Sequence, residues 1–187
     1  MRRLQDQVGF SMLELVVVLL VLGVVCVVAC PVYASQRSKA EDVLLVANAR
    51  NLVTPVAAGW ADVQSAGPTS LSGSIVVARQ WLAKELADPR EAGAGLHFVN
   101  PCTGSDRVVD ADRLPSGDIS PAVWITSSAG FDSETFRASD ATVARLRGSI
   151  IVDYVVDAQQ RRGHIEVFSV DRDGRRSAAV QTIPMAD

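Results

Sequence analysis

One carboxylate stands inside the most apolar stretch of this sequence. Residues 9–31 read GFSMLELVVVLLVLGVVCVVACP, and Glu14 is the only charged residue among them. An acidic side chain at the centre of a lipid-embedded helix costs about 2.5–3.5 kcal/mol, so it is rare there. Because a lone carboxylate in apolar surroundings must be neutralised or paired, Glu14 is a candidate functional residue that needs a cationic partner.

The other residues that could do chemistry form no catalytic pattern. His97 and His164 lie far apart, and no Ser/His/Asp or Cys/His arrangement frames either of them. The sequence also contains no GxSxG, no HExxH and no phosphate-binding glycine loop. We predict that each histidine is a half-exposed strand residue, that the chain is not an enzyme, and that it needs no cofactor.

An oxygen-rich stretch near the C-terminus raises the question of calcium. Asp171 to Gly174 reads DRDG, which does not meet the EF-hand pattern and is typical of a hairpin turn. We therefore predict a turn and no metal. Cys26 and Cys30 lie in the apolar run, which leaves Cys102 alone and excludes a disulfide framework or a CxxC metal site in the rest of the chain.

Arginines near the C-terminus raise the question of nucleic acid. They are interleaved with acidic residues, and the net charge of the chain is −3. This mixture favours a solvated surface of both signs over a nucleic-acid partner. The arginines are Arg161, Arg162, Arg172, Arg175 and Arg176, and the acids are Asp153, Asp157, Glu166, Asp171 and Asp173.

The apolar run has the length of a membrane-spanning helix. Phe10 to Cys30 would extend about 31 Å as a helix, enough to cross a bilayer core. Arg2 and Arg3 favour a cytoplasmic N-terminus, with the bulk of the chain outside. Two alternatives are a signal peptide cut after Val32-Tyr33-Ala34 and a lipoprotein signal ending at Cys30, but neither accounts for Glu14.

The stretch GFSMLEL resembles the prepilin signature of type IV pilins and the related pseudopilins. The resemblance implies that a prepilin peptidase cuts between Gly9 and Phe10 and N-methylates Phe10. It implies that Glu14 pairs with the ammonium group of Phe10 in a neighbouring subunit. It also implies that Gly23 and Pro31 weaken the helix.

The resemblance further implies an organisation and a function. Residues 1–9 would be the leader, residues 10–31 the transmembrane and assembly helix, and residues 32–187 a pilin-like head outside the cytoplasm. The chain would be a structural subunit of a type IV pilus or related filament, with copies of itself or sister pilins and the membrane assembly machinery as partners. Alternatives are a type II secretion pseudopilin, a minor pilin of a DNA-uptake pilus, and an exported lipoprotein or secreted binding domain.

Downstream patterns predict an α+β head, with a long N-terminal helix packed on a C-terminal antiparallel sheet. The first helix should run from about Ser11 to Asn51 or beyond, and apolar residues at helical spacing from Val46 to Val63 should face the sheet. Period-two alternation marks Ile150–Val156 as a half-buried strand. Further predicted elements are helices at Ser74–Leu86 and Ala138–Arg147, strands at Leu96–Val99, Ala122–Thr126, Ile165–Val170 and Ala178–Ile183, and a long loop at Asn100–Pro121.

Overall fold

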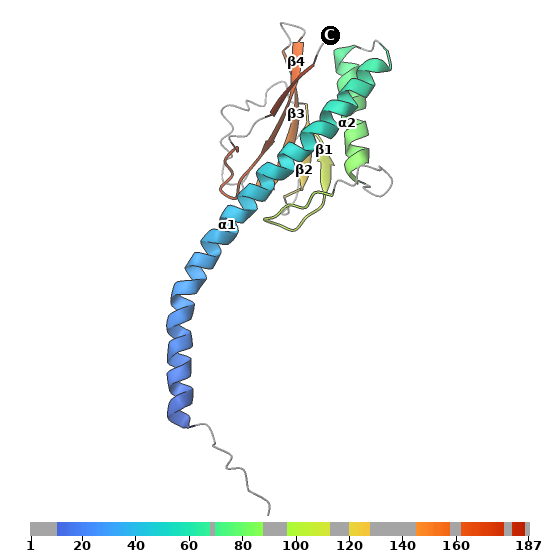
Figure 1. Ribbon diagram of the computed structural model, residues 1–187. Helices are drawn as coiled ribbons and strands as arrows, with labels where there is room; N and C mark the ends of the chain where they lie inside the picture. The colour runs from blue at the N-terminus through green and yellow to red at the C-terminus, as the bar shows by residue number, and fades with distance from the viewer. Residues whose placement is uncertain are drawn as a thin grey trace, which may run out of the picture. The chain divides into compact units, whose positions relative to one another are not determined.

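The computed structural model describes residues 11–67, 70–87, 97–112, 120–127, 145–157, 162–177 and 181–185 (Figure 1). The chain divides into two compact units, Met1–Lys39 and Ala40–Asp187, which are described one at a time. Helix α1, Met12–Ser65, contributes its first part to one unit and its second part to the other.

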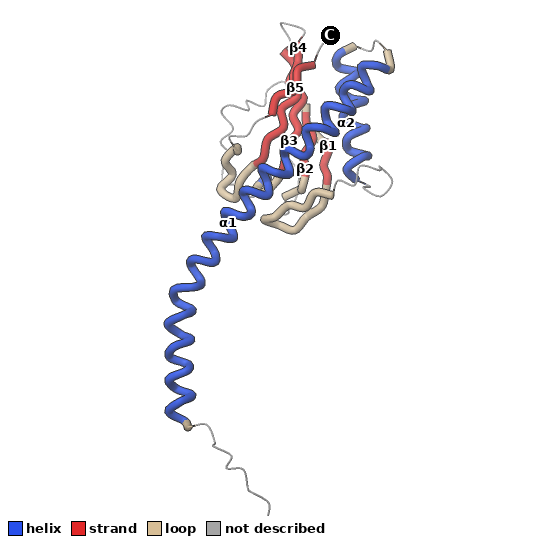
Figure 2. The backbone as a smooth tube through the Cα atoms, viewed as in Figure 1, coloured by secondary structure: helices blue, strands red, loops and turns tan. Residues whose placement is uncertain are grey.

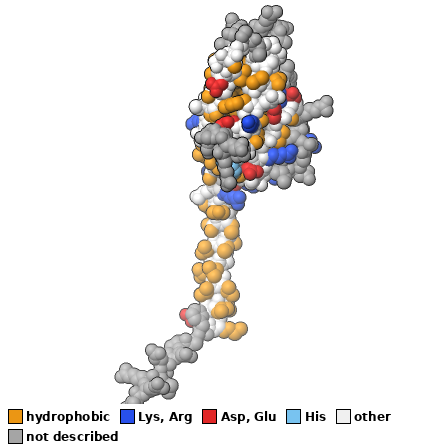
Figure 3. Space-filling model, turned by 90° about the vertical axis from the view of Figure 1, so that its right-hand side faces the viewer, with side chains coloured by type: hydrophobic (Ala, Val, Ile, Leu, Met, Phe, Trp, Pro, Cys, Tyr) orange, Lys and Arg blue, Asp and Glu red, His pale blue; other side chains and the backbone are white. Residues whose placement is uncertain are grey.

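In the first unit α1 begins with an apolar stretch that ends at Ala34, and the polar residues Ser35 to Lys39 follow it. Its large hydrophobic side chains, from Met12 to Tyr33, are all exposed, and hydrophobic side chains cover the face seen in Figure 3. The segment is apolar all round rather than on one stripe, which suits lipid or a bundle of like helices better than the surface of a soluble head. By length and composition α1 is a candidate membrane span.

The second unit is built on a five-stranded sheet in the order β1-β2-β3-β4-β5 (Figures 1 and 2). Strands β1, β2 and β3 run parallel, whereas β3, β4 and β5 run antiparallel. The strands are β1 Val108–Asp110, β2 Val123–Thr126, β3 Ile150–Asp157, β4 Arg162–Ser169 and β5 Gln181–Met185.

Two helices share one face of this sheet. The second part of α1 buries a stripe of Leu45, Ala49, Leu52, Val56 and Trp60, and α2, Leu71–Ala87, packs into the same core. The ring of Trp60 lies 6.5 Å from that of Tyr154 on β3, which ties the helix to the middle of the sheet. The α+β fold class is thus confirmed: a long N-terminal helix packs on a C-terminal sheet.

The opposite face of the sheet is buried across β2, β3 and β4, whereas Thr182 and Pro184 of β5 on this face are exposed. Trp124, Ile151 and Phe168 form a second apolar cluster with Leu146 and Val170. On the same face of β3, Asp153 is fully buried. The prediction that Ile150–Val156 is half-buried is therefore wrong, although its strand type and its inward residues Ile150, Val152 and Tyr154 are confirmed.

The sheet is mixed rather than wholly antiparallel. A parallel pair needs a connection of about a dozen residues or more, and residues 111–122 and 127–149 provide such connections before β2 and β3. Only the short link at 158–161 and the turn before β5 join antiparallel neighbours. Periodicity identifies strands but carries no information about their direction.

Several predicted elements are confirmed. The helix at Ser74–Leu86 is α2, the strand at Ala122–Thr126 is β2, and Ile165–Val170 corresponds to β4. The predicted last strand at Ala178–Ile183 corresponds to β5, which begins at Gln181. Helix α1 extends well past Asn51 and passes through Pro55 without interruption.

Two predictions between α2 and β2 are wrong. His97 to Val99 form no strand, and the expected loop at Asn100–Pro121 contains the short strand β1. A three-residue strand is too short to show a period in the sequence. Most of the predicted helix at Ala138–Arg147 lies outside the described residues; Arg145 and Leu146 are helical, and Arg147 and Gly148 form a turn.

Candidate functional site

The best-supported candidate site is the beginning of α1. Glu14 lies in its first turn and is exposed, as are the apolar residues that follow it. The backbone N–H groups of Glu14 and Leu15 both donate to Ser11 O, at 3.0 and 3.2 Å. An acidic residue in a first turn is favoured by the helix dipole, which gives Glu14 a local role besides any pairing with another chain.

Two further predicted site residues also lie in this helix. A Cβ added at Gly23 would meet nothing within 4 Å. Close packing within the described chain therefore does not require glycine at this position. Pro31 lies inside α1, whose helical assignment continues on both sides of it. The helix therefore accommodates both residues, and the predicted weakness of this segment stays a prediction.

Gly9 and Phe10 lie outside the described residues. The predictions that the chain is cut between these two residues and methylated at Phe10 therefore lie outside the described residues, as does the position of Phe10 relative to Glu14. Among the predicted site residues, the described part of the chain includes Glu14, Gly23 and Pro31, and all three lie on one helix.

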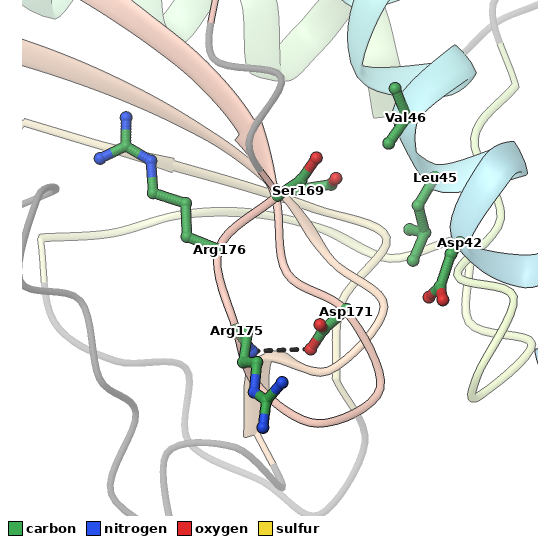
Figure 4. Close-up of a pocket in the computed structure, with 8 residues that line it drawn as sticks. Asp42, Leu45, Val46, Ser169, Asp171, Arg175 and Arg176 are labelled. Atoms are coloured by element: carbon green, nitrogen blue, oxygen red, sulfur yellow. Dashed lines mark hydrogen bonds between the residues drawn. The ribbon is translucent and has the colours of Figure 1, made fainter. Parts of the chain in front are cut away.

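The head carries a pocket of about 280 Å³ between α1 and the turn after β4 (Figure 4). Asp42, Leu45 and Val46 line one wall, and Ser169, Asp171 and Ser177 lie across from them. Burial first, and then the charges of Asp171, Asp173 and Glu41, raise the pKa of Asp42. Among the residues that the structure describes, no group of three His, Cys, Asp or Glu side chains could hold a metal ion.

The DRDG stretch forms the predicted turn. Asp171 O accepts a hydrogen bond from Gly174 N–H at 3.1 Å, and the Asp171 carboxylate accepts one from Arg175 N–H at 2.7 Å. Val170 and Arg176 pair across the turn. The carboxylate of Asp171 thus serves to close the turn, a role that side-chain oxygens of Asp commonly have.

The two histidines do not meet. His97 is exposed outside any strand, and its Nε2 lies 3.9 Å from Asp106 Oδ2. His164 is the half-buried strand residue that the sequence predicts, on β4, with Nε2 3.1 Å from Glu166 Oε1. Glu166 also accepts a hydrogen bond from Arg176, whose guanidinium lies over the ring of Phe168 at 4.4 Å. These contacts hold the turn against the sheet. None of them brings a Ser, Thr or Cys side chain to either histidine.

One polar cluster in the described head, centred on Arg79, was not predicted from the sequence. Arg79 on α2 donates from Nε to Asp110 at 2.9 Å and from Nη1 to Asp112 at 2.6 Å, and it also donates to Ser127 Oγ. Its side chain is only 10% exposed. This Arg79 clasp joins α2 to the ends of β1 and β2, because charge-assisted bonds to two carboxylates offset the cost of burying the guanidinium.

The clasp also changes the titration of a carboxyl group. Burial alone would raise the pKa of Asp112, but the hydrogen bond from Ser127 N–H and the Arg79 guanidinium hold that pKa below its ordinary value. Burial raises the pKa of the nearby Tyr154 phenol. The lowered pKa keeps Asp112 ionised beside Arg79, so the cluster has a structural role.

Cys102 lies in a tight loop around Asn100. Asn100 donates to Pro121 O and Arg147 O at 2.9 Å each, and its Oδ1 accepts from Cys102 N–H. A Cβ at Gly148, whose φ is +72°, would come within 2.3 Å of Asn100 Oδ1. Burial first, and then the charge of Glu41, raise the pKa of the Cys102 thiol, which makes it a weak nucleophile at neutral pH.

The fold and the site together define an α+β protein with an apolar helix that is a candidate membrane span. In comparison with known proteins, the chain matches no protein-family profile, no curated protein and no solved structure.

Proposed function

We propose that the chain is a structural, non-enzymatic subunit of a type IV pilus or a related filament. A prepilin peptidase cuts it between Gly9 and Phe10 and methylates Phe10. The N-terminal helix first anchors the subunit in the cytoplasmic membrane, with the head outside the cytoplasm. It then packs with the same helix of other copies or of sister pilins, with the help of membrane assembly machinery.

One observation carries this proposal: from Met12 to Tyr33, α1 is apolar and exposed on every side, apart from the single carboxylate of Glu14. A helix of this kind is stable only in lipid or against other helices. The helix dipole favours an acidic residue in the first turn, but it supplies no counter-charge for a carboxylate in lipid, so Glu14 still needs a cationic partner.

Glu14 has a physical role if its partner is the new N-terminus of another copy. Cleavage creates an α-amino group on Phe10, and methylation keeps its positive charge. Two unit charges attract far more strongly in an apolar filament core than in water. A stagger that separates them leaves a buried charge unpaired at a cost of about 3–5 kcal/mol, so the pair selects one axial register between subunits.

Two narrower forms of the proposal share this chemistry. The filament is either a pilus, including a DNA-uptake pilus, or the pseudopilus of a secretion system. In the head, Glu166 and Phe168 hold Arg176 internally, and the exposed Arg172 and Arg175 alternate with Asp171 and Asp173, which favours a protein assembly over nucleic-acid contact. An exported lipoprotein or a secreted binding domain is the competing class.

Mass spectrometry of the mature protein separates these classes. A chain that begins at N-methylated Phe10 is the expected result. A diacylglyceryl group on Cys30, a chain that begins at Ser35, or a chain that keeps residues 1–9 would overturn the proposal.

The charge pair is tested with Glu14→Val and its matched control Glu14→Asp. Glu14→Val should be processed normally but should enter filaments about tenfold less, because the ammonium partner is left unpaired. Glu14→Asp keeps the charge and should lose much less. The readout is the share of mature protein in sheared, pelleted filaments. Equal incorporation of both variants and the wild type would rule out the pairing.

A further inference from the structure

The head has an apolar groove where the end of α1 runs beside α2 (Figure 1). Its volume is about 320 Å³, and a single charged residue lies among apolar and glycine residues in its lining. The lining that the argument uses is Gly59, Asp62, Val63, Val77 and Trp81. We call this surface the Trp81 groove.

Close packing of the two helices forms the wall of the groove. A Cβ at Gly59 would lie 2.2 Å from Cζ3 of Trp81, so only glycine lets the indole ring rest against α1. Val77, one turn before Trp81, stays 49% exposed at the side of the groove. An apolar hollow on a well-packed head is a feature of surfaces that bind another apolar surface.

A complementary surface lies nearer the start of the head's part of α1. Val43 and Leu44 are 70% and 47% exposed, although their neighbour Leu45 is buried against the sheet. Arg50 is exposed on the same side of the helix, about two turns beyond Val43. We call Val43, Leu44 and Arg50 the Val43 face; it combines apolar side chains with a positive charge.

The charges of the two surfaces cannot meet within one chain. Arg50 and Asp62 lie about 18 Å apart along the axis of the same helix, beyond the reach of an arginine side chain. Neither forms an ion pair with another residue in the described part of the chain. Arg50 can therefore reach Asp62 only in another copy.

We propose that the Trp81 groove receives the Val43 face of a second copy of this chain, with Arg50 of one copy opposite Asp62 of the next. This inference rests on the proposed filament function and adds a contact between heads to it. The two surfaces are different and occupy different parts of α1, so the contact is heterologous. A heterologous contact repeats along an open array unless its rotation closes a ring.

Two neighbouring valines give a matched test of the groove. Val77→Arg puts a charge at the groove wall, whereas Val76→Arg puts the same charge one residue away, at a side chain that is 51% exposed and does not line the groove. In cells, Val77→Arg should lower the pelleted filament fraction at least about fivefold, and Val76→Arg less than about twofold. Thermal unfolding of both full-length proteins in detergent checks that the heads remain folded.

Charge reversal tests the partner. Asp62→Arg and Arg50→Asp should each lower the filament fraction about threefold, and the double variant should recover to within about twofold of the wild type, because it restores an opposite pair. Asp106→Arg, a reversal at an exposed carboxylate outside both surfaces, is the control and should have no effect.

The outcomes separate this inference from the function on which it rests. If the wild type forms filaments but Val77→Arg and Val76→Arg assemble alike, or the double variant is no better than its parents, the head contact is wrong and the filament stands. If Val43→Asp lowers membrane retention of the unassembled subunit without affecting assembly, the Val43 face contacts lipid, and the inference also fails. A wild type that forms no filament overturns both.

Discussion

Arg79 shows how a single side chain can hold a helix against a sheet edge. Its partners Asp110, Asp112 and Ser127 come from the ends of two strands, and the guanidinium is nearly buried. Loss of Arg79 would leave Asp110 and Asp112 close together without a counter-charge, and Asp110 is largely shielded from water. Most of the stability lost on removal of Arg79 would therefore come from the carboxylates that are left unpaired.

We expect Arg79→Met to lower the free energy of unfolding by about 2–3 kcal/mol, because Asp110 loses its counter-charge while Asp112 keeps partial access to water. Urea unfolding of the full-length protein in detergent measures the change. Lys84→Met, at an exposed position on the same helix, is the control and should change stability by less than about 0.5 kcal/mol. Equal effects of the two substitutions would contradict the structural role of the clasp.

Gly59 gives a steric prediction. Gly59→Ala should cost about 1–3 kcal/mol, because the new methyl group forces the Trp81 ring away from α1 and outweighs the gain in helix propensity. The tryptophan emission spectrum should shift as the ring moves, and urea unfolding gives the energy. A more stable protein with an unchanged spectrum would contradict the predicted clash.

The sequence indicated the candidate site at Glu14 but not the Arg79 clasp, for a physical reason. Glu14 stands out because it is a charge in an apolar run, which is a local signal. Arg79 is separated from its partners by 31, 33 and 48 positions, and each partner is an ordinary polar residue near a strand end. Only the folded sheet brings them together.

At the scale of elements, predictability followed the length and regularity of each pattern. Helix α2 and the strands β3 and β4 have clear periods and were predicted, whereas the three-residue β1 was not. The parallel pairing of β1, β2 and β3 depends on long connections and leaves no mark in local alternation. Period-two alternation predicts one solvent-facing side for β3, but Asp153 on that side is fully buried, which local alternation cannot indicate.

The helix of the first unit gives a prediction about its own flexibility. Gly23→Ala adds a methyl group that meets nothing within 4 Å and should stabilise the helix by about 1 kcal/mol. Amide hydrogen exchange in the following turns, measured in detergent micelles, should slow about fivefold. Val24→Ala, a change without a glycine effect, is the control. Unchanged exchange in Gly23→Ala would mean that Gly23 is not a weak point.

For the whole molecule, two carboxyl groups of the head should act on acid stability with opposite signs. The folded-state pKa of Asp112 lies below its unfolded value of 3.8, so its contribution is present above pH 3.8 and is lost as the pH falls further. The folded-state pKa of Asp42 lies above 3.8, so its contribution is lost as the pH rises through that raised value.

Urea unfolding between pH 3 and 6 tests these signs. Asp112→Asn should make the rise of stability with pH shallower, because it removes a favourable carboxylate. Asp42→Asn should make the rise steeper, because it removes a carboxyl group that is easier to protonate in the folded state. The same change of slope in both variants would contradict the pKa directions.

The order of the chain has a consequence for biosynthesis. The helix stripe from Leu45 to Trp60 is translated early, but β3 to β5, which share its apolar core, occupy Ile150–Met185. A nascent chain that has released α1 from the ribosome therefore presents an uncovered apolar surface until the codons for Ile150–Met185 have been read. Messages truncated before Ile150 should yield products that aggregate or are degraded, and a chaperone that shields α1 would act within this interval.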